Sequence, residues 1–87
     1  MFEVQTGSMK DEINPSDWII IKLTKDVEIN DVVTYKHDGN YITHRVIEAY
    51  QGTYVTKGDN NNTKDDPIDQ SQIVGKVVKV LRGFGIL

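Results

Sequence analysis

The dipeptide Asp38-Gly39 constrains the fold of this chain more than any other feature. A type I′ turn needs positive φ at both central residues, which Asp and Gly tolerate, so Asp-Gly between two strand-forming runs predicts a β-hairpin. Residues 32–36 precede the turn and residues 41–50 follow it, and both runs are rich in β-branched and aromatic residues. The centre of the chain is therefore predicted to be an antiparallel hairpin.

Similar runs fill much of the remaining chain. Gln51-Gly52 predicts a second tight turn into a strand at residues 53–57. Further strands are expected at residues 2–5, 18–23 and 74–81, with a polar loop at 10–17 and a short connector at 68–73. The run 18–23 is nearly unbroken in apolarity, which favours a strand covered on both faces at the centre of the core. With no amphipathic helix pattern, the chain is predicted to be an all-β domain, barrel-like or sandwich-like.

Length and composition limit the possible functions. At 87 residues the chain forms one domain, which buries only about 60 to 65 per cent of its unfolded surface. A net charge of −3 disfavours binding to nucleic acid through phosphate neutralisation. The absence of cysteine excludes disulfides and thiolate metal sites. No apolar run reaches the roughly 20 residues of a membrane span, and no signal-peptide pattern opens the chain.

Three polar residues in order along the chain could perform nucleophilic catalysis. Gly7 frees the backbone for a sharp turn that presents Ser8 at the end of a strand. A serine hydroxyl needs a base within hydrogen-bond reach, and usually a third group that fixes the tautomer of the base. His44 can be this base because imidazole titrates near neutrality. Asp59, in the turn after residues 53–57, is the candidate third group.

Each histidine also has a structural interpretation. The two-residue period of a strand places Ile42, His44 and Val46 on one face, so His44 could be a core histidine hydrogen-bonded to backbone. His37 stands at the predicted hairpin tip, where a solvated loop histidine is expected. A zinc site would need both histidines together with carboxylates, a spacing that the sequence does not favour.

The polar loop at residues 58–67 also has a structural interpretation. Its Asp and Asn residues can form turns through side-chain to backbone hydrogen bonds. A calcium loop is the alternative, but the terminal glutamate of an EF-hand and its flanking helices are missing. We therefore expect neither a metal ion nor a cofactor.

Five short stretches together resemble the type I signal peptidases, in the serine–histidine branch of the endoplasmic reticulum, of archaea and of SipW-like enzymes. Their order and spacing agree with that family over nearly the whole chain. They are Gly7-Ser8-Met9, Asp31-Val32-Val33-Thr34-Tyr35, Thr43-His44-Arg45-Val46, Thr56-Lys57-Gly58-Asp59-Asn60-Asn61 and Val74-Gly75-Lys76-Val77.

This resemblance implies a membrane-bound enzyme that cleaves signal peptides from secreted preproteins on the extracytoplasmic face of the cell membrane. Ser8 would be the nucleophile, and His44 would be the general base where bacterial housekeeping enzymes use lysine. Asp59 is the first choice to orient His44, and Asp65 or Asp66 matches a further acidic residue of the family. The backbone N–H of Ser8 would donate to the oxyanion.

The resemblance also implies a fold shared with LexA-like self-cleaving repressors. Met9 and Ile42 are expected to line shallow apolar pockets for the small residues before the scissile bond, and the substrate would bind as an added strand. Membrane segments are expected before Phe2 and after Leu87, so that residues 1–87 form only the catalytic domain.

One departure from the family pattern leads to an alternative function. The family usually continues Ser-Met-x-Pro, whereas Met9 is followed by Lys10-Asp11-Glu12 here, so the proline that would stiffen this segment is absent. The alternative is a catalytically weak or inactive module that binds secreted or pilus-type proteins at the cell surface. A self-cleaving repressor domain would need a strand lysine as base, and Thr43-His44-Arg45 argues against it.

Overall fold

The computed structural model describes residues 2–3, 7–10 and 12–82, and within them the chain is all-β, as predicted. In this part of the chain no helix has the length and apolarity that a membrane span requires. The elements are β1 (Phe2–Glu3), β2 (Trp18–Leu23), β3 (Val32–His37), β4 (Asn40–Tyr50), β5 (Thr53–Lys57), β6 (Ile68–Asp69), the 3₁₀ turn η1 (Gln70–Gln72) and β7 (Ile73–Leu81).

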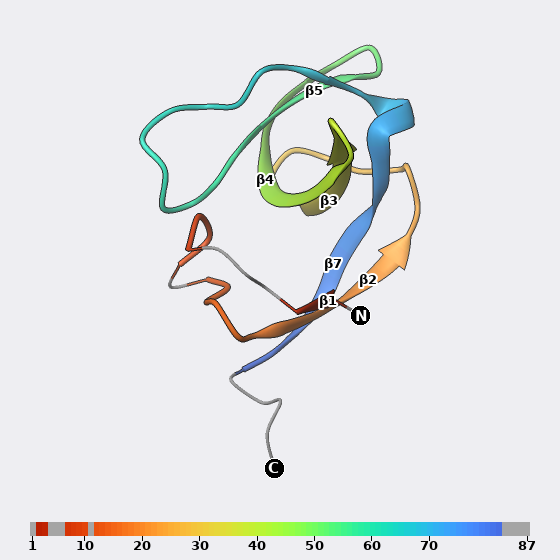
Figure 1. The fold of residues 1–87 in the computed structure, drawn as a ribbon. Coiled ribbons are helices and arrows are strands. Elements are labelled where there is room, and N and C mark those ends of the chain that lie inside the picture. The colour runs from red at the N-terminus through yellow and green to blue at the C-terminus, as the bar shows by residue number, and fades with distance from the viewer. Residues whose placement is uncertain (1, 4–6, 11, 83–87) are drawn as a thin grey trace.

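The described strands form one sheet in the order β1-β2-β7-β3-β4-β5-β6, and every neighbouring pair is antiparallel. β7 joins the two halves of the sheet, because it pairs with β2 along residues 75–81 and with β3 along residues 73–76. Figure 1 shows the sheet strongly coiled, with the β3–β4 hairpin curled inside the turn of the chain. This coiling gives the domain the barrel-like form that the strand pattern indicated.

Both predicted hairpin turns are present. Asp38 and Gly39 have φ of 51° and 81°, and Gln51 and Gly52 have φ of 46° and 81°. Positive φ at both central residues is the signature of a type I′ turn, whose twist matches that of the flanking strands. The turns fix the pairing of β3 with β4 and of β4 with β5, and therefore the face on which each β4 side chain lies.

Two clusters of buried apolar side chains fill the domain. We call the larger one the main core, and it gathers residues from β3 to β7 and the β2–β3 connection. The smaller one, the second core, joins the segment after Ser8 to β2. The main core contains Val27, Val33, Tyr35, Val46, Tyr54, Ile68 and Ile73; the second core contains Met9, Ile13 and Ile19, with Ile21, Val32, Val77 and Val80 packed against it.

Two expectations about individual segments were wrong. β2 is not covered on both faces: Ile19 is buried, but Leu23 is 77% exposed. Leu23 is the last residue of β2 and lies opposite Gly75, which has no side chain to cover it. The connector at residues 68–73 is partly regular, since it contains β6 and η1, and η1 is closed by a capping box between Asp69 and Gln72. Residues 4–5 of the first predicted strand lie outside the described residues.

Candidate active site

The hydroxyl of Ser8 and the imidazole of His44 meet, although 36 residues separate them in the chain. Ser8 Oγ lies 3.1 Å from His44 Nε2. His44 points inward from β4 and is 8% exposed, and Ser8 is half-buried in the turn that precedes the second core. This distance is within the reach that a general base needs to accept the proton of a hydroxyl.

Asp65 is the residue that contacts the other nitrogen of His44. Its Oδ2 lies 2.5 Å from His44 Nδ1, and the two side chains are 26% and 10% exposed. The backbone N–H of Asp65 donates to the carbonyl of Thr56 at 2.8 Å, which fastens this part of the loop to the end of β5. A carboxylate on Nδ1 keeps the proton there and leaves Nε2 free to accept one from Ser8.

Asp59, the first choice to orient His44, instead binds Arg45, so that expectation is corrected. Arg45 donates from Nε to Oδ1 at 3.0 Å and from Nη2 to Oδ2 at 2.9 Å. These hydrogen bonds lower the pKa of Asp59 below its ordinary value. The physical reason is the alternation of β4: His44 and Arg45 are consecutive, so they lie on opposite faces, and Asp59 pairs on the face of Arg45.

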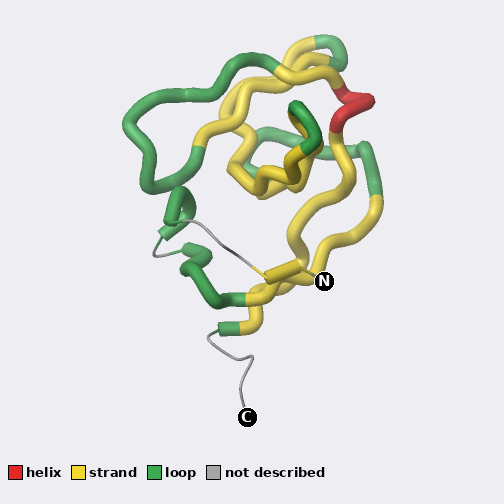
Figure 2. The backbone as a smooth tube through the Cα atoms, viewed as in Figure 1, coloured by secondary structure: helices red, strands yellow, loops and turns green. Residues whose placement is uncertain are grey.

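Residues 58–61, at the start of the loop that carries Asp59 and Asp65, contact the segment around Ser8, and we call them the clamp loop. The backbone N–H of Asn60 donates to the carbonyl of Ser8 at 2.8 Å, and its side-chain amide donates to the carbonyl of Gly7 at 3.1 Å. Gly58 is so close that a Cβ there would lie 2.6 Å from the Ser8 carbonyl oxygen. Figure 2 shows the clamp loop and the segment at residues 7–10 facing each other on one side of the domain.

The two residues expected to line substrate pockets differ in their placement. Met9 is 2% exposed, packs in the second core and accepts a hydrogen bond at Sδ from the N–H of Asp59, so it forms no surface wall. Ile42 is partly buried and lines a hollow of about 350 Å³ beside His44 and Asp65. Asp66 is exposed and lines the same hollow.

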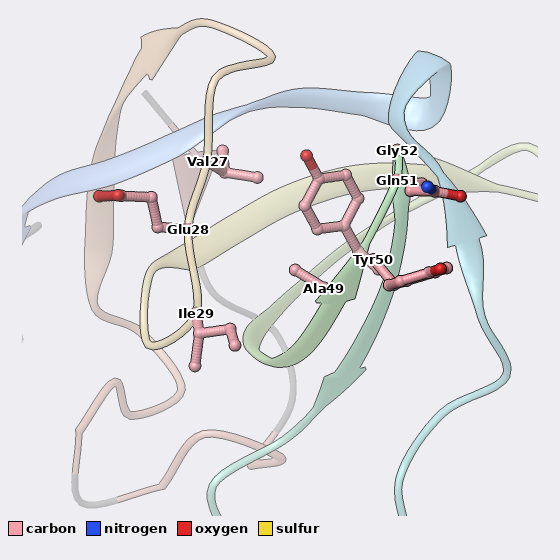
Figure 3. Close-up of a pocket in the computed structure, with 8 residues that line it drawn as sticks. Val27, Glu28, Ile29, Ala49, Tyr50, Gln51 and Gly52 are labelled. Atoms are coloured by element: carbon pink, nitrogen blue, oxygen red, sulfur yellow. The ribbon is translucent and has the colours of Figure 1, made fainter.

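A second hollow, of about 500 Å³, lies between the β2–β3 connection and the β4–β5 turn (Figure 3). Val27 and Ile29 line it on one side and Ala49 and Tyr50 on the other, and Figure 3 shows the Glu28 side chain pointing away from Ala49 and Tyr50. Ser8, His44 and Asp65 are not among its lining residues. Among the described residues, no group of three or more His, Cys, Asp or Glu side chains could hold a metal ion.

Two hydroxyl groups that reach Asp65 were not predicted from the sequence. Thr56 Oγ1 donates to Asp65 Oδ2 at 2.8 Å, and the hydroxyl of Tyr35 donates to the same oxygen at 3.4 Å. Burial raises the pKa of Tyr35. The strand period at residues 53–57 places Thr56 on the inward face with Tyr54, and a buried threonine needs a hydrogen-bond partner. That signal could have identified Thr56 from the sequence.

The arrangement brings together a hydroxyl, an imidazole and a carboxylate, in contact in that order. Such a set can attack a carbonyl carbon through Ser8 and form a covalent acyl intermediate. The family model of Peptidase S24-like proteins matches residues 1–78 of the chain, which include Ser8, His44 and Asp65. A search of curated proteins found no match.

Proposed function

Because the chain belongs to the Peptidase S24-like family, we propose that it is the catalytic domain of a serine endopeptidase that removes signal peptides from secreted preproteins. The observation that carries the proposal is the continuous contact from Ser8 through His44 to Asp65. Three groups in this order are what peptide-bond cleavage through a serine requires. The resemblance of five stretches to type I signal peptidases supports the choice of substrate.

In the proposed reaction, His44 Nε2 accepts the proton of Ser8 as Oγ attacks the carbonyl carbon of the scissile bond. The backbone N–H of Ser8 donates to the oxyanion that develops. The protonated His44 then donates its proton to the leaving amine, and the acyl group stays on Ser8. Water, deprotonated by His44, then attacks this ester; the bond to Oγ breaks, His44 returns the proton to Oγ, and the carboxylic acid leaves. Asp65 stabilises the protonated imidazole through Nδ1 and is not itself protonated.

The proposed substrate binds in an extended conformation beside the active site. The hollow lined by Ile42 lies next to His44 and is a candidate contact for substrate side chains. Main-chain hydrogen bonds to an added strand would supply affinity. We propose that the domain works on the extracytoplasmic face of the cell membrane, held there by segments outside residues 1–87.

The alternative of a binding module without turnover has less support. Its one support in the sequence is the missing proline after Ser8-Met9. Backbone hydrogen bonds hold the segment without it: Lys10 N–H donates to the Gly7 carbonyl at 3.0 Å, and Ile13 N–H donates to the Met9 carbonyl at 2.7 Å. These contacts lie on both sides of the position where the family has proline, and Ser8 Oγ lies within reach of His44.

The test is cleavage of a co-expressed preprotein by the membrane protein that carries this domain. Ser8→Ala and His44→Ala should each lower the cleavage rate by about a thousandfold or more, because each removes a group that takes part in bond breaking. Ser71→Ala is the matched control, since Ser71 is an exposed serine in η1 away from the site. Cleavage at the wild-type rate by either site variant would refute the proposal.

A further inference from the structure

We infer that Thr56 and Tyr35 are positioning residues that hold the carboxylate of Asp65 against His44. The inference rests on the proposed function, because its consequence is a faster reaction at Ser8. The resemblance to signal peptidases gave neither of these two residues a role.

Three side chains converge on one oxygen atom. Asp65 Oδ2 lies 2.5 Å from His44 Nδ1, 2.8 Å from Thr56 Oγ1 and 3.4 Å from the hydroxyl oxygen of Tyr35. The two hydroxyl oxygens are 3.1 Å apart. Each hydroxyl has a single proton, and an ionised carboxylate is the strongest acceptor of the three groups, so both protons are directed at Asp65.

The sheet places the two hydroxyls on either side of His44. β4 lies between β3 and β5. On β3, Tyr35 is opposite Ile42, and on β5, Thr56 is opposite Val46. Ile42 and Val46 flank His44 at a spacing of two residues, so all five side chains share the inward face, and Tyr35 and Thr56 are diagonal neighbours of His44. Their positions are therefore set by strand register.

Burial makes these contacts rigid. Thr56 is 0% exposed and Tyr35 is 2% exposed, so water does not compete for their hydroxyls. Asp65 itself is on a long loop, which by its backbone alone would leave the carboxylate free to turn. Burial also raises the pKa of Tyr35, which keeps its hydroxyl protonated and able to donate under alkaline conditions. A loop carboxylate is thus fixed by two strand residues.

Thr56→Val tests the inference, because valine keeps the shape of threonine and removes the hydroxyl. We expect kcat for preprotein cleavage to fall by about tenfold to a hundredfold, as for other groups that support a catalytic residue, with KM changed less than about twofold. Thr56→Ser should restore kcat, since serine supplies the hydroxyl. Tyr35→Phe should have the smaller effect, because its contact with Asp65 is longer.

Thr34→Val is the matched control. Thr34 is 1% exposed, lies on β3 beside Tyr35, and its hydroxyl is 2.8 Å from that of Thr43 rather than from Asp65. It should lower the melting temperature about as much as Thr56→Val and leave kcat unchanged. If kcat falls equally in Thr34→Val and Thr56→Val, the inference is overturned, because the loss would then come from a general decrease in stability.

A double-mutant cycle shows whether Thr56 acts through Asp65. In an Asp65→Asn background, Thr56→Val should lower kcat by less than about twofold, because the interaction is already lost. An undiminished effect in that background would overturn the inference. So would full activity of Thr56→Val while Ser8→Ala is inactive, and in that case the proposed function would stand.

A measurement without turnover separates the two proposals. The proton between His44 Nδ1 and Asp65 gives an NMR resonance whose position and exchange with solvent report that contact. Thr56→Val should move this resonance and speed its exchange, whereas Thr34→Val should not. This result is expected even if Ser8→Ala cleaves preprotein normally, in which case the proposed function alone fails. An unchanged resonance in Thr56→Val would overturn the inference.

Discussion

The two ends of the loop at residues 58–67 each carry an aspartate that binds a β4 side chain, yet the two contacts have different consequences. At the start of the loop, Asp59 pairs with Arg45 from within the clamp loop, whose Asn60 N–H donates to the Ser8 carbonyl. Near its end, Asp65 contacts His44 on the inward face. His44 and Arg45 are consecutive, so their side chains lie on opposite faces of β4, and the same loop contacts one residue on each face. One loop therefore contacts the Ser8 backbone at its start and the His44 side chain near its end.

The largest expected difference is between Asp65→Asn and Asp59→Asn. An amide at residue 65 can donate to Nδ1 and favour the wrong tautomer of His44, so kcat/KM should fall by about a thousandfold to ten-thousandfold. Asp59→Asn should lower it by less than about tenfold, because Asp59 acts on loop position only. Cleavage assays of the two variants measure both effects. An equal or larger loss in Asp59→Asn would reverse the assignment of the two ends.

Gly58→Ala should have an intermediate effect, by displacing the clamp loop from the nucleophile. The added Cβ would lie 2.6 Å from the Ser8 carbonyl oxygen and 3.0 Å from the Ser8 Cβ. Overpacking of this kind costs about 1 to 3 kcal/mol of stability. A displaced nucleophile should lower kcat by about a hundredfold. Thermal unfolding and kcat of the folded protein are the two measurements.

Gly75→Ala is the matched control for this prediction. A Cβ at Gly75 would lie 2.4 Å from the Lys22 carbonyl oxygen, between β7 and β2 and away from Ser8. It should destabilise the fold and leave kcat of the folded fraction unchanged. If Gly58→Ala resembles Gly75→Ala in retaining kcat, the clamp loop does not position Ser8.

The smallest expected effect is the pH dependence of stability from Asp59. Arg45 lowers the pKa of Asp59 in the folded protein below its ordinary 3.8, so the folded state favours the carboxylate. This contribution is present above the unfolded pKa and is lost as the pH falls through the folded one. The pair is partly exposed, so it should contribute at most about 1 kcal/mol.

Denaturant unfolding near neutral pH and in acid checks this effect. The stability of the wild type should fall more than that of Asp59→Asn as the pH drops below the ordinary pKa of the carboxyl. If the two proteins lose the same stability as the pH falls, the ion pair of Asp59 with Arg45 does not stabilise the folded state.

Local sequence rules were sufficient for much of the fold. Asp38-Gly39 and Gln51-Gly52 specify their turns through positive φ, and those turns set the register that turns His44 inward. The exposure of Leu23 was not predictable in this way, because the position of β2 in the sheet depends on pairing between residues distant in the chain.

The site was only partly predictable. The pairing of Ser8 with His44 was predicted from short stretches, and the two side chains are in contact. The aspartate beside His44 was not predicted, because a polar loop has no periodicity that aims its side chains. Arg45, next to His44, binds Asp59 in place of His44, and this contact depends on the position of the loop, which the sequence alone does not give. Met9 could equally have lined a pocket or filled a core, and packing against Ile13 and Ile19 decided between them.

The most direct test of the Ser8–His44–Asp65 unit is the covalent intermediate itself. A reaction with preprotein, quenched in acid and examined by mass spectrometry, should show an acyl group on Ser8. It should form at nearly the wild-type rate in Asp59→Asn, much more slowly in Asp65→Asn and not at all in His44→Ala. Cleavage without an adduct on Ser8, or equal adduct formation in Asp65→Asn and wild type, would contradict the mechanism.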